Sequence, residues 1–209
     1  MKKITGSVFI LAIFSAIAFN ANAQKGKVNL NLDYSYSLPL GSFKNNIISN
    51  ASPRGLNGAL MYGISNKLSV GLQSGYQDYY QKYPRDVYTT GDHEVTSAVL
   101  SNSLQTIPLI AKAMYTPLAD NKAFIQPYIS LGTGISLTDY RQYLGEFGSV
   151  SSTANFTVQG GAGIKVAFKK NSTSGFNIGA GYNYIAYRKF GYSNLDNLSF
   201  QAGVHFPLK

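Results

Sequence analysis

The chain has 209 residues and a formal net charge of +9, yet charged residues make up only 13% of it, about half the share usual in a soluble domain. It has no cysteine, which excludes disulfides, thiolate metal sites and a lipid-modified cysteine anchor. The 16 Tyr, 12 Phe and 21 Gly residues, with no Trp, are typical of an aromatic, glycine-rich sheet protein.

The first 23 residues have the layout of an export signal. Lys2 and Lys3 precede an apolar run, and the small residues Ala-Asn-Ala end the segment at Ala23. The run is too short for a membrane-spanning helix, and no later stretch reaches 18 apolar residues. We therefore expect residues 1–23 to be a signal peptide cleaved after Ala23. The remaining domain, 24–209, would carry a charge of about +7 (9 minus 2).

Eight stretches of the mature chain alternate apolar and polar residues. In chain order they predict strands at 28–40, 56–64, 68–81, 99–115, 124–140, 155–168, 175–187 and 198–208. A period of two marks a strand with two different faces, and the longer stretches exceed the five or six residues of an ordinary globular strand. Pro108, inside the fourth stretch, predicts a bulge or a missing ladder bond there.

The connections alternate between short turns and longer irregular segments. We expect the long ones at 41–54, 82–98, 141–152 and 189–197. Up-and-down outer-membrane barrels are built this way, with short periplasmic turns and longer external loops. The predicted fold class is all-β, an eight-stranded antiparallel up-and-down transmembrane β-barrel in the cell outer membrane.

A soluble sandwich or a lipocalin-like barrel would show the same alternation with its apolar face turned inward. The polar face here is dense in glycine, which suits the interior of a narrow barrel and favours the membrane alternative. Aromatic residues near the strand ends predict two interfacial girdles. The turn-end girdle would hold Tyr62, Tyr115, Phe124, Phe168, Phe176 and Phe206, and the loop-end girdle Tyr76, Tyr79, Tyr140 and Tyr187.

Four segments resemble the outer-membrane β-barrel domain family that includes PorT-like, porin-family proteins of Gram-negative bacteria. They are YSLPLGSF at 36–43, LQTIPL at 104–109, QPYISLGTG at 126–134 and GGAGI at 160–164. The resemblance implies a small barrel and carries no catalytic motif. Some relatives assist a secretion machine, so it also implies a possible accessory role of that kind.

Candidate chemistry is sparse. The glycine clusters at 132–134 and 160–165 complete no nucleotide-binding motif and sit inside predicted strands. Asp92, His93 and Glu94 form the one compact titratable cluster, on a predicted external loop, where a solvated loop tip is favoured over a catalytic site. We expect no cofactor, no metal and no catalytic residues.

Four charged or titratable residues fall on the predicted inward face. They are Asp33, Lys112, Lys165 and His205. Charges inside a barrel are costly unless paired, which predicts a polar plug filling a lumen just wide enough for side chains. A proton or ion path is the alternative role for them.

Basic residues gather at the loop ends of the strands. They are Arg54, Lys82, Arg85, Arg141, Arg188 and Lys189. Lipopolysaccharide phosphates lie at this height, and arginine binds phosphate as a bidentate donor, so a lipid-contacting rim and an ordinary solvated rim both remain open.

The sequence thus predicts a non-enzymatic barrel with a structural, interaction or secretion-accessory role through its external loops. Its expected partners are outer-membrane lipid and lipopolysaccharide, other envelope proteins, and the barrel assembly machinery during biogenesis, but not nucleic acid. A small outer-membrane hydrolase or acyltransferase that modifies lipid or peptide, and a narrow channel, are the alternatives.

Overall fold

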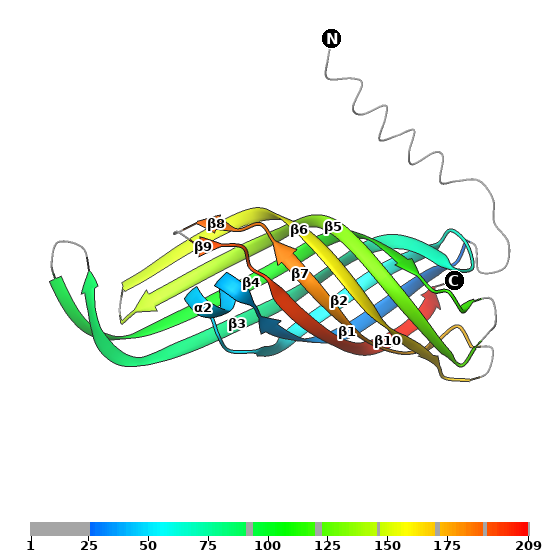
Figure 1. The fold of residues 1–209 in the computed structure, drawn as a ribbon, viewed down its shortest axis with the longest axis horizontal. Helices are drawn as coiled ribbons and strands as arrows, with labels where there is room; N and C mark the ends of the chain where they lie inside the picture. The colour runs from blue at the N-terminus through cyan, green and yellow to red at the C-terminus, as the bar shows by residue number, and fades with distance from the viewer. Residues whose placement is uncertain are drawn as a thin grey trace, which may run out of the picture.

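The structure, a computed structural model, describes residues 26–90, 94–119, 123–145, 147–169, 172–189 and 192–208. Eight antiparallel strands close into one barrel in the order β1-β10-β7-β6-β5-β4-β3-β2, so the predicted fold class is confirmed (Figure 1). The wall consists of β1 (Val28–Pro39), β2 (Ser52–Gly63), β3 (Leu68–Thr90), β4 (Glu94–Tyr115), β5 (Ile125–Leu144), β6 (Phe147–Ala167), β7 (Gly175–Ile185) and β10 (Asn197–Leu208). Helix α2 (Gly41–Asn46) and a small hairpin of β8 (Arg188–Lys189) and β9 (Tyr192–Ser193) lie in two of the connections. Among the described residues, no helix is long and apolar enough to cross a membrane.

The two faces of the wall are opposite to those of a soluble barrel. Large apolar side chains such as Leu56, Leu72 and Leu131 are 60 to 69% exposed on the outside. Polar side chains such as Gln73 and Gln159 are buried inside, at 3% and 5%. Apolar residues outside and polar residues inside are what a bilayer requires of a barrel, which rules out the lipocalin-like alternative.

Two segments expected to be irregular are strands instead. The expected loop at 82–98 continues the β3–β4 ladder, which pairs Thr90 with Glu94 after one register shift between Lys82 and Arg85. The expected loop at 141–152 continues the β5–β6 ladder up to the pair Leu144 and Phe147. These parts lack the clean alternation because they lie beyond the apolar band, where both faces meet water.

One smaller boundary also differs, whereas the interruption expected at Pro108 is present. The expected loop at 41–54 is wrong at its end, because β2 begins at Ser52 and pairs with β1 across a register shift between Ser35 and Ser37. Opposite Pro108, the β3–β4 pairing is interrupted between Ser74 and Gln77 without a change of register, as a proline lacking its N–H requires.

The predicted turn-end girdle is on the outside of the barrel, with Tyr62, Tyr115, Phe124, Phe168 and Phe176 exposed. At the outer end the prediction is wrong for Tyr79, Tyr140 and Tyr187, which are 1 to 3% exposed and point into the lumen. Each of these tyrosines is an even number of positions from the inward residues of its strand. The alternation along the strand therefore predicts that it points inward. The exposed tyrosines at that end are Tyr34, Tyr36, Tyr76, Tyr80, Tyr143 and Tyr182.

Candidate functional site

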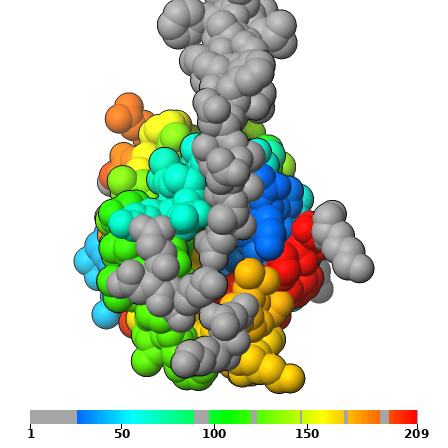
Figure 2. Space-filling model, turned by 90° about the vertical axis from the view of Figure 1, so that its right-hand side faces the viewer, coloured from blue at the N-terminus to red at the C-terminus, as the bar shows by residue number. Residues whose placement is uncertain are grey.

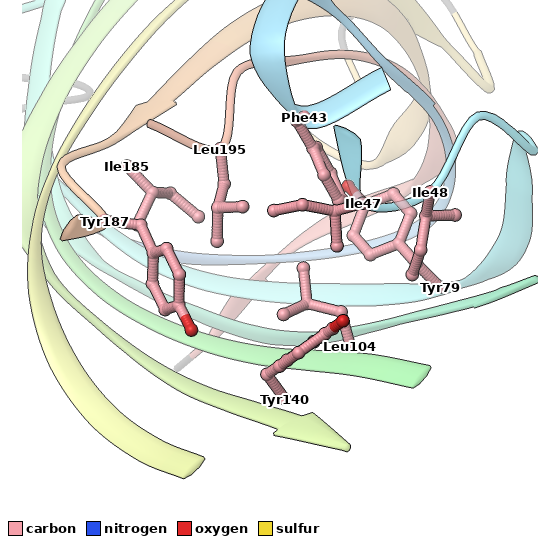
Figure 3. Close-up of a cluster of buried hydrophobic side chains, with 9 residues drawn as sticks. All are labelled: Phe43, Ile47, Ile48, Tyr79, Leu104, Tyr140, Ile185, Tyr187 and Leu195. Atoms are coloured by element: carbon pink, nitrogen blue, oxygen red, sulfur yellow. The ribbon is translucent and has the colours of Figure 1, made fainter. Parts of the chain in front are cut away.

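The outer end of the lumen is closed by an apolar cluster, which we call the outer plug (Figure 3). Its members come from α2 and the residues after it, from the wall, and from the connections around β7 and β10. They are Phe43, Ile47, Ile48, Tyr79, Leu104, Tyr140, Ile185, Tyr187 and Leu195, all at most 5% exposed. The sequence pattern did not predict this cluster, because Phe43, Ile47 and Ile48 lie in a segment expected to be a loop.

Directional contacts hold the outer plug in place. The rings of Phe43 and Tyr79 meet edge to face with centroids 4.9 Å apart. The side chain of Asn102, on β4, donates to the backbone oxygen of Ile47 at 2.9 Å. The backbone N–H of Leu40 donates to the carbonyl of Asp196 at 2.8 Å, so the β1–β10 ladder continues to the residues from which the first and last outer connections start.

Below the outer plug the lumen is polar and nearly full. The hydroxyls of Ser37 and Tyr79 are 2.6 Å apart, and Ser37 also donates to Asn197 at 3.0 Å. Asn183 donates to Asn197 and Ser199 at 2.8 and 3.1 Å. The cavity left in this layer is only about 40 Å³, too small for a continuous water column.

The predicted lumen residues lie on four different strands in the periplasmic half. Asp33, Lys112 and Lys165 are half-buried and His205 is buried. Asp33 accepts a hydrogen bond from Asn177 Nδ2, and Lys112 donates to Gln73 at 2.8 Å. The structure therefore brings these residues into one part of the lumen, while their role as a plug remains a prediction.

Glycines on the inner wall make room for these large side chains. A Cβ on Gly203, between β1 and β7, would lie 2.4 Å from the Asp33 carboxylate, so glycine lets this side chain reach across to Asn177. The ring of Tyr128 similarly lies against Gly163 and Gly179, where an added Cβ would approach it to 2.7 and 2.5 Å.

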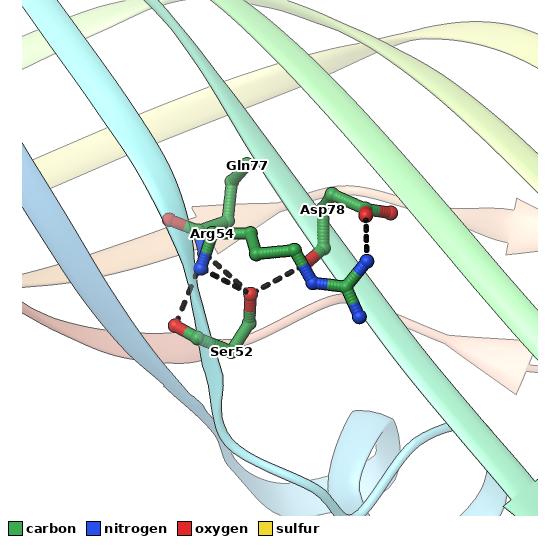
Figure 4. A network of polar contacts seen from close by, with 4 residues as sticks. All are labelled: Ser52, Arg54, Gln77 and Asp78. Carbon is green, nitrogen blue, oxygen red and sulfur yellow. Dashed lines mark hydrogen bonds and ion pairs between the residues drawn. The ribbon is translucent and has the colours of Figure 1, made fainter.

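The basic rim is not one ring of free cations. Arg54 pairs with Asp78 at 2.9 Å and lies 6.0 Å from the centroid of the Tyr80 ring. Gln77 donates to the Ser52 hydroxyl at 2.8 Å beside this pair (Figure 4).

Arg141 pairs with Asp139 at 2.6 Å, while Lys82, Arg85 and Arg188 are exposed and form no ion pair among the described residues. Lys82 and Arg85 lie four and seven residues beyond Asp78 on β3, or roughly 13 to 23 Å farther along the strand. The backbone of Lys189 is in β8, and its side chain lies outside the described part of the chain.

The titratable cluster at 92–94 cannot be placed. Asp92 and His93 lie outside the described residues, and of Glu94 only the backbone, at the start of β4, is described. In the part of the chain that the structure describes, no three His, Cys, Asp or Glu side chains gather as a metal site would require.

The closed wall, the apolar outer face and the filled polar lumen together define a small outer-membrane β-barrel protein. Residues 7–206 match the family described as "Outer membrane protein beta-barrel domain", and the chain belongs to that family. The family and the inverted faces place the protein in the outer membrane. No curated protein matches the sequence.

Two solved barrels illustrate the likeness. Neisserial surface protein A (NspA) is 17% identical with a TM-score of 0.56, and the match covers 89% of this chain and 98% of that one. The outer membrane protein OprG from Pseudomonas aeruginosa is 13% identical with a TM-score of 0.54, covering 90% and 99% of the two chains. At these identities the likeness concerns the fold alone.

Proposed function

We propose that this protein is a sealed, non-enzymatic outer-membrane barrel that acts by binding envelope components outside the membrane. The observation that carries the proposal is the unequal length of the strands. Strands β3 to β6 have 20 to 23 residues, whereas β1, β2, β7 and β10 have 11 or 12. A tilted strand crosses the bilayer in about 9 to 11 residues, so about ten residues of each long strand project outside it.

The projecting strands form a sheet continuous with the wall, visible at the left of Figure 1. It carries Val87, Phe147 and Val150, which are 61 to 70% exposed. Since this part lies beyond the bilayer, these side chains face water, and exposed apolar surface of this kind suits contact with a partner. A secretion-accessory role fits the same surface. Export by a signal peptide cleaved after Ala23 belongs to the proposal.

The sealed state predicts that the wild-type barrel does not conduct. We expect no discrete ion conductance after reconstitution into planar bilayers, because the outer plug and the polar layer leave no continuous water path. A general porin added to the same bilayers provides the positive control. Stable unitary steps from the purified wild-type protein would contradict the sealed barrel and favour the narrow channel.

We further propose that the basic rim contacts lipopolysaccharide phosphates. Lys82, Arg85 and Arg188 form no ion pair with a described residue and should contribute most, because Arg54 and Arg141 are already neutralised by Asp78 and Asp139. Replacing the three by Gln is expected to lower the lipopolysaccharide that co-purifies with the barrel at least twofold. The control replaces Arg54 and Arg141 by Gln, which we expect to have a smaller effect. Equal yields from wild type and the triple variant would reject the rim as a lipid contact.

A further inference from the structure

A second cavity, of about 80 Å³, lies in the lumen at the periplasmic end. It shares no lining residue with the cavity under the outer plug. Figure 2 faces this end, and the start of β1, the turn after β2, part of the connection after β6 and the C-terminal strand are visible on it. A cavity of this size has room for a few waters or one small oxyanion.

The lining of this cavity is rich in donors. Lys27 and Lys165 contribute ammonium groups, Asn29 an amide, and Ser69 and Thr116 hydroxyls. His205 also lines it, and its Nδ1 is buried without a hydrogen-bond partner among the described residues. No aspartate or glutamate belongs to the described lining, so the cavity is positively charged.

The ammonium group of Lys165 forms no direct ion pair among the described residues. Its nitrogen lies 5.7 Å from the centroid of the Tyr128 ring, and it makes no hydrogen bond or ion pair with any described residue. The acid of the lower lumen, Asp33, is held by Asn177, which pairs with Lys165 in the wall and lies between the two. A half-buried ammonium without a directly paired anion is costly, and a bound anion would offset that cost.

We propose that this cavity binds a small oxyanion of the phosphate class, with Lys165 as its main ligand and Lys27 as a second cation. Lysine is a common phosphate ligand, and hydroxyl and amide donors suit the several oxygens of such an anion. The anion is either free inorganic phosphate or the phosphate of a lipid headgroup in the periplasmic leaflet, since both have the same binding chemistry.

Thermal unfolding of the mature barrel in phosphate-free micelles tests the site. We expect sodium phosphate to raise the unfolding temperature in a saturable manner, compared with sodium chloride at matched ionic strength. Lys165→Met should weaken phosphate binding at least tenfold. In chloride alone the same variant should unfold at or above the wild-type temperature, because it removes a half-buried charge that has no direct ion pair.

The control is Lys169→Met, which removes the same charge from an exposed position outside the cavity and should keep the wild-type response. If Lys165→Met fails to fold, Lys27→Met at the exposed position should weaken binding at least twofold.

Lipid nanodiscs without free phosphate separate the two sources of the anion. If phosphatidylglycerol stabilises the barrel more than phosphatidylcholine does, and Lys165 is required for the difference, the bound anion is a lipid headgroup. If only free phosphate stabilises the barrel, the bound anion is the inorganic ion. The proposal is wrong if neither free phosphate nor phosphatidylglycerol stabilises the barrel in a saturable manner. It is also wrong if Lys169→Met loses the stabilisation by phosphate as fully as Lys165→Met.

Discussion

Replacing Phe43 by alanine is expected to release α2 from the barrel mouth and to speed tryptic cleavage after Lys44 at least 100-fold. Phe43 is fully buried and packs edge to face on Tyr79, while Lys44 is exposed one residue later. Truncating a buried Phe to Ala costs about 3–5 kcal/mol, and every 1.4 kcal/mol changes an opening equilibrium about tenfold. A time course of limited proteolysis in micelles, with the fragments identified by mass spectrometry, measures the effect.

The matched control is Phe147→Ala, which truncates a 70% exposed phenylalanine on the projecting part of β6. It should leave cleavage after Lys44 at the wild-type rate. We expect the barrel itself to survive in both variants, because the hydrogen bonds of the wall do not involve either side chain. A wild-type cleavage rate in Phe43→Ala would mean that the outer plug is held in place by other contacts.

Replacing Gly163 by valine is expected to prevent the barrel from closing correctly. A Cβ at this position would lie 2.4 Å from the backbone oxygen of Ile178 and 2.7 Å from the ring of Tyr128. The ring can turn aside, but the backbone of the neighbouring strand cannot move without breaking the ladder. Overpacking usually costs about 1–3 kcal/mol, and a clash with backbone belongs at or above the top of that range. The measurement is the folded fraction after refolding into micelles, read from heat-modifiable gel mobility, followed by urea unfolding.

Gly160→Val provides the control on the same strand. A Cβ at Gly160 would meet only the side chain of Leu131, at 3.6 Å, which is ordinary contact on the outer face. This variant should fold with near wild-type yield and stability. If both valine variants fold equally well, the close approach at Gly163 does not limit the barrel.

The sequence and the structure agree best inside the bilayer. Residues Ile125, Ile129 and Leu131 alternate with polar residues, and the structure turns them outward at 53 to 69% exposure. The same period of two predicts that Asp33 and Lys165 point into the lumen, and both are half-buried there. The pattern is readable because lipid on one side and a narrow polar interior on the other impose opposite demands on alternate residues.

Outside the bilayer no lipid requires alternate residues to be apolar, and the prediction of strands from alternation fails there. The segments 82–98 and 141–152 have polar residues on both faces, so they resemble loops in the sequence although they continue the ladders of β3 to β6. Backbone pairing with a neighbouring strand decides their structure, and that partner is not visible in the local pattern. The ion pair of Arg54 with Asp78, across two strands, is hidden for the same reason.

Alternation along the chain therefore predicts the membrane-spanning part of all eight strands, their lipid-facing sides and the charged residues that point into the lumen. The three-dimensional packing was needed to find that α2 folds back to close the mouth, that Tyr79 and Tyr140 join the outer plug, and that Lys165 faces a cavity with no acidic residue in its described lining. These features depend on which residues meet across the barrel, since its closure brings together side chains more than 100 residues apart, such as Tyr79 and Tyr187.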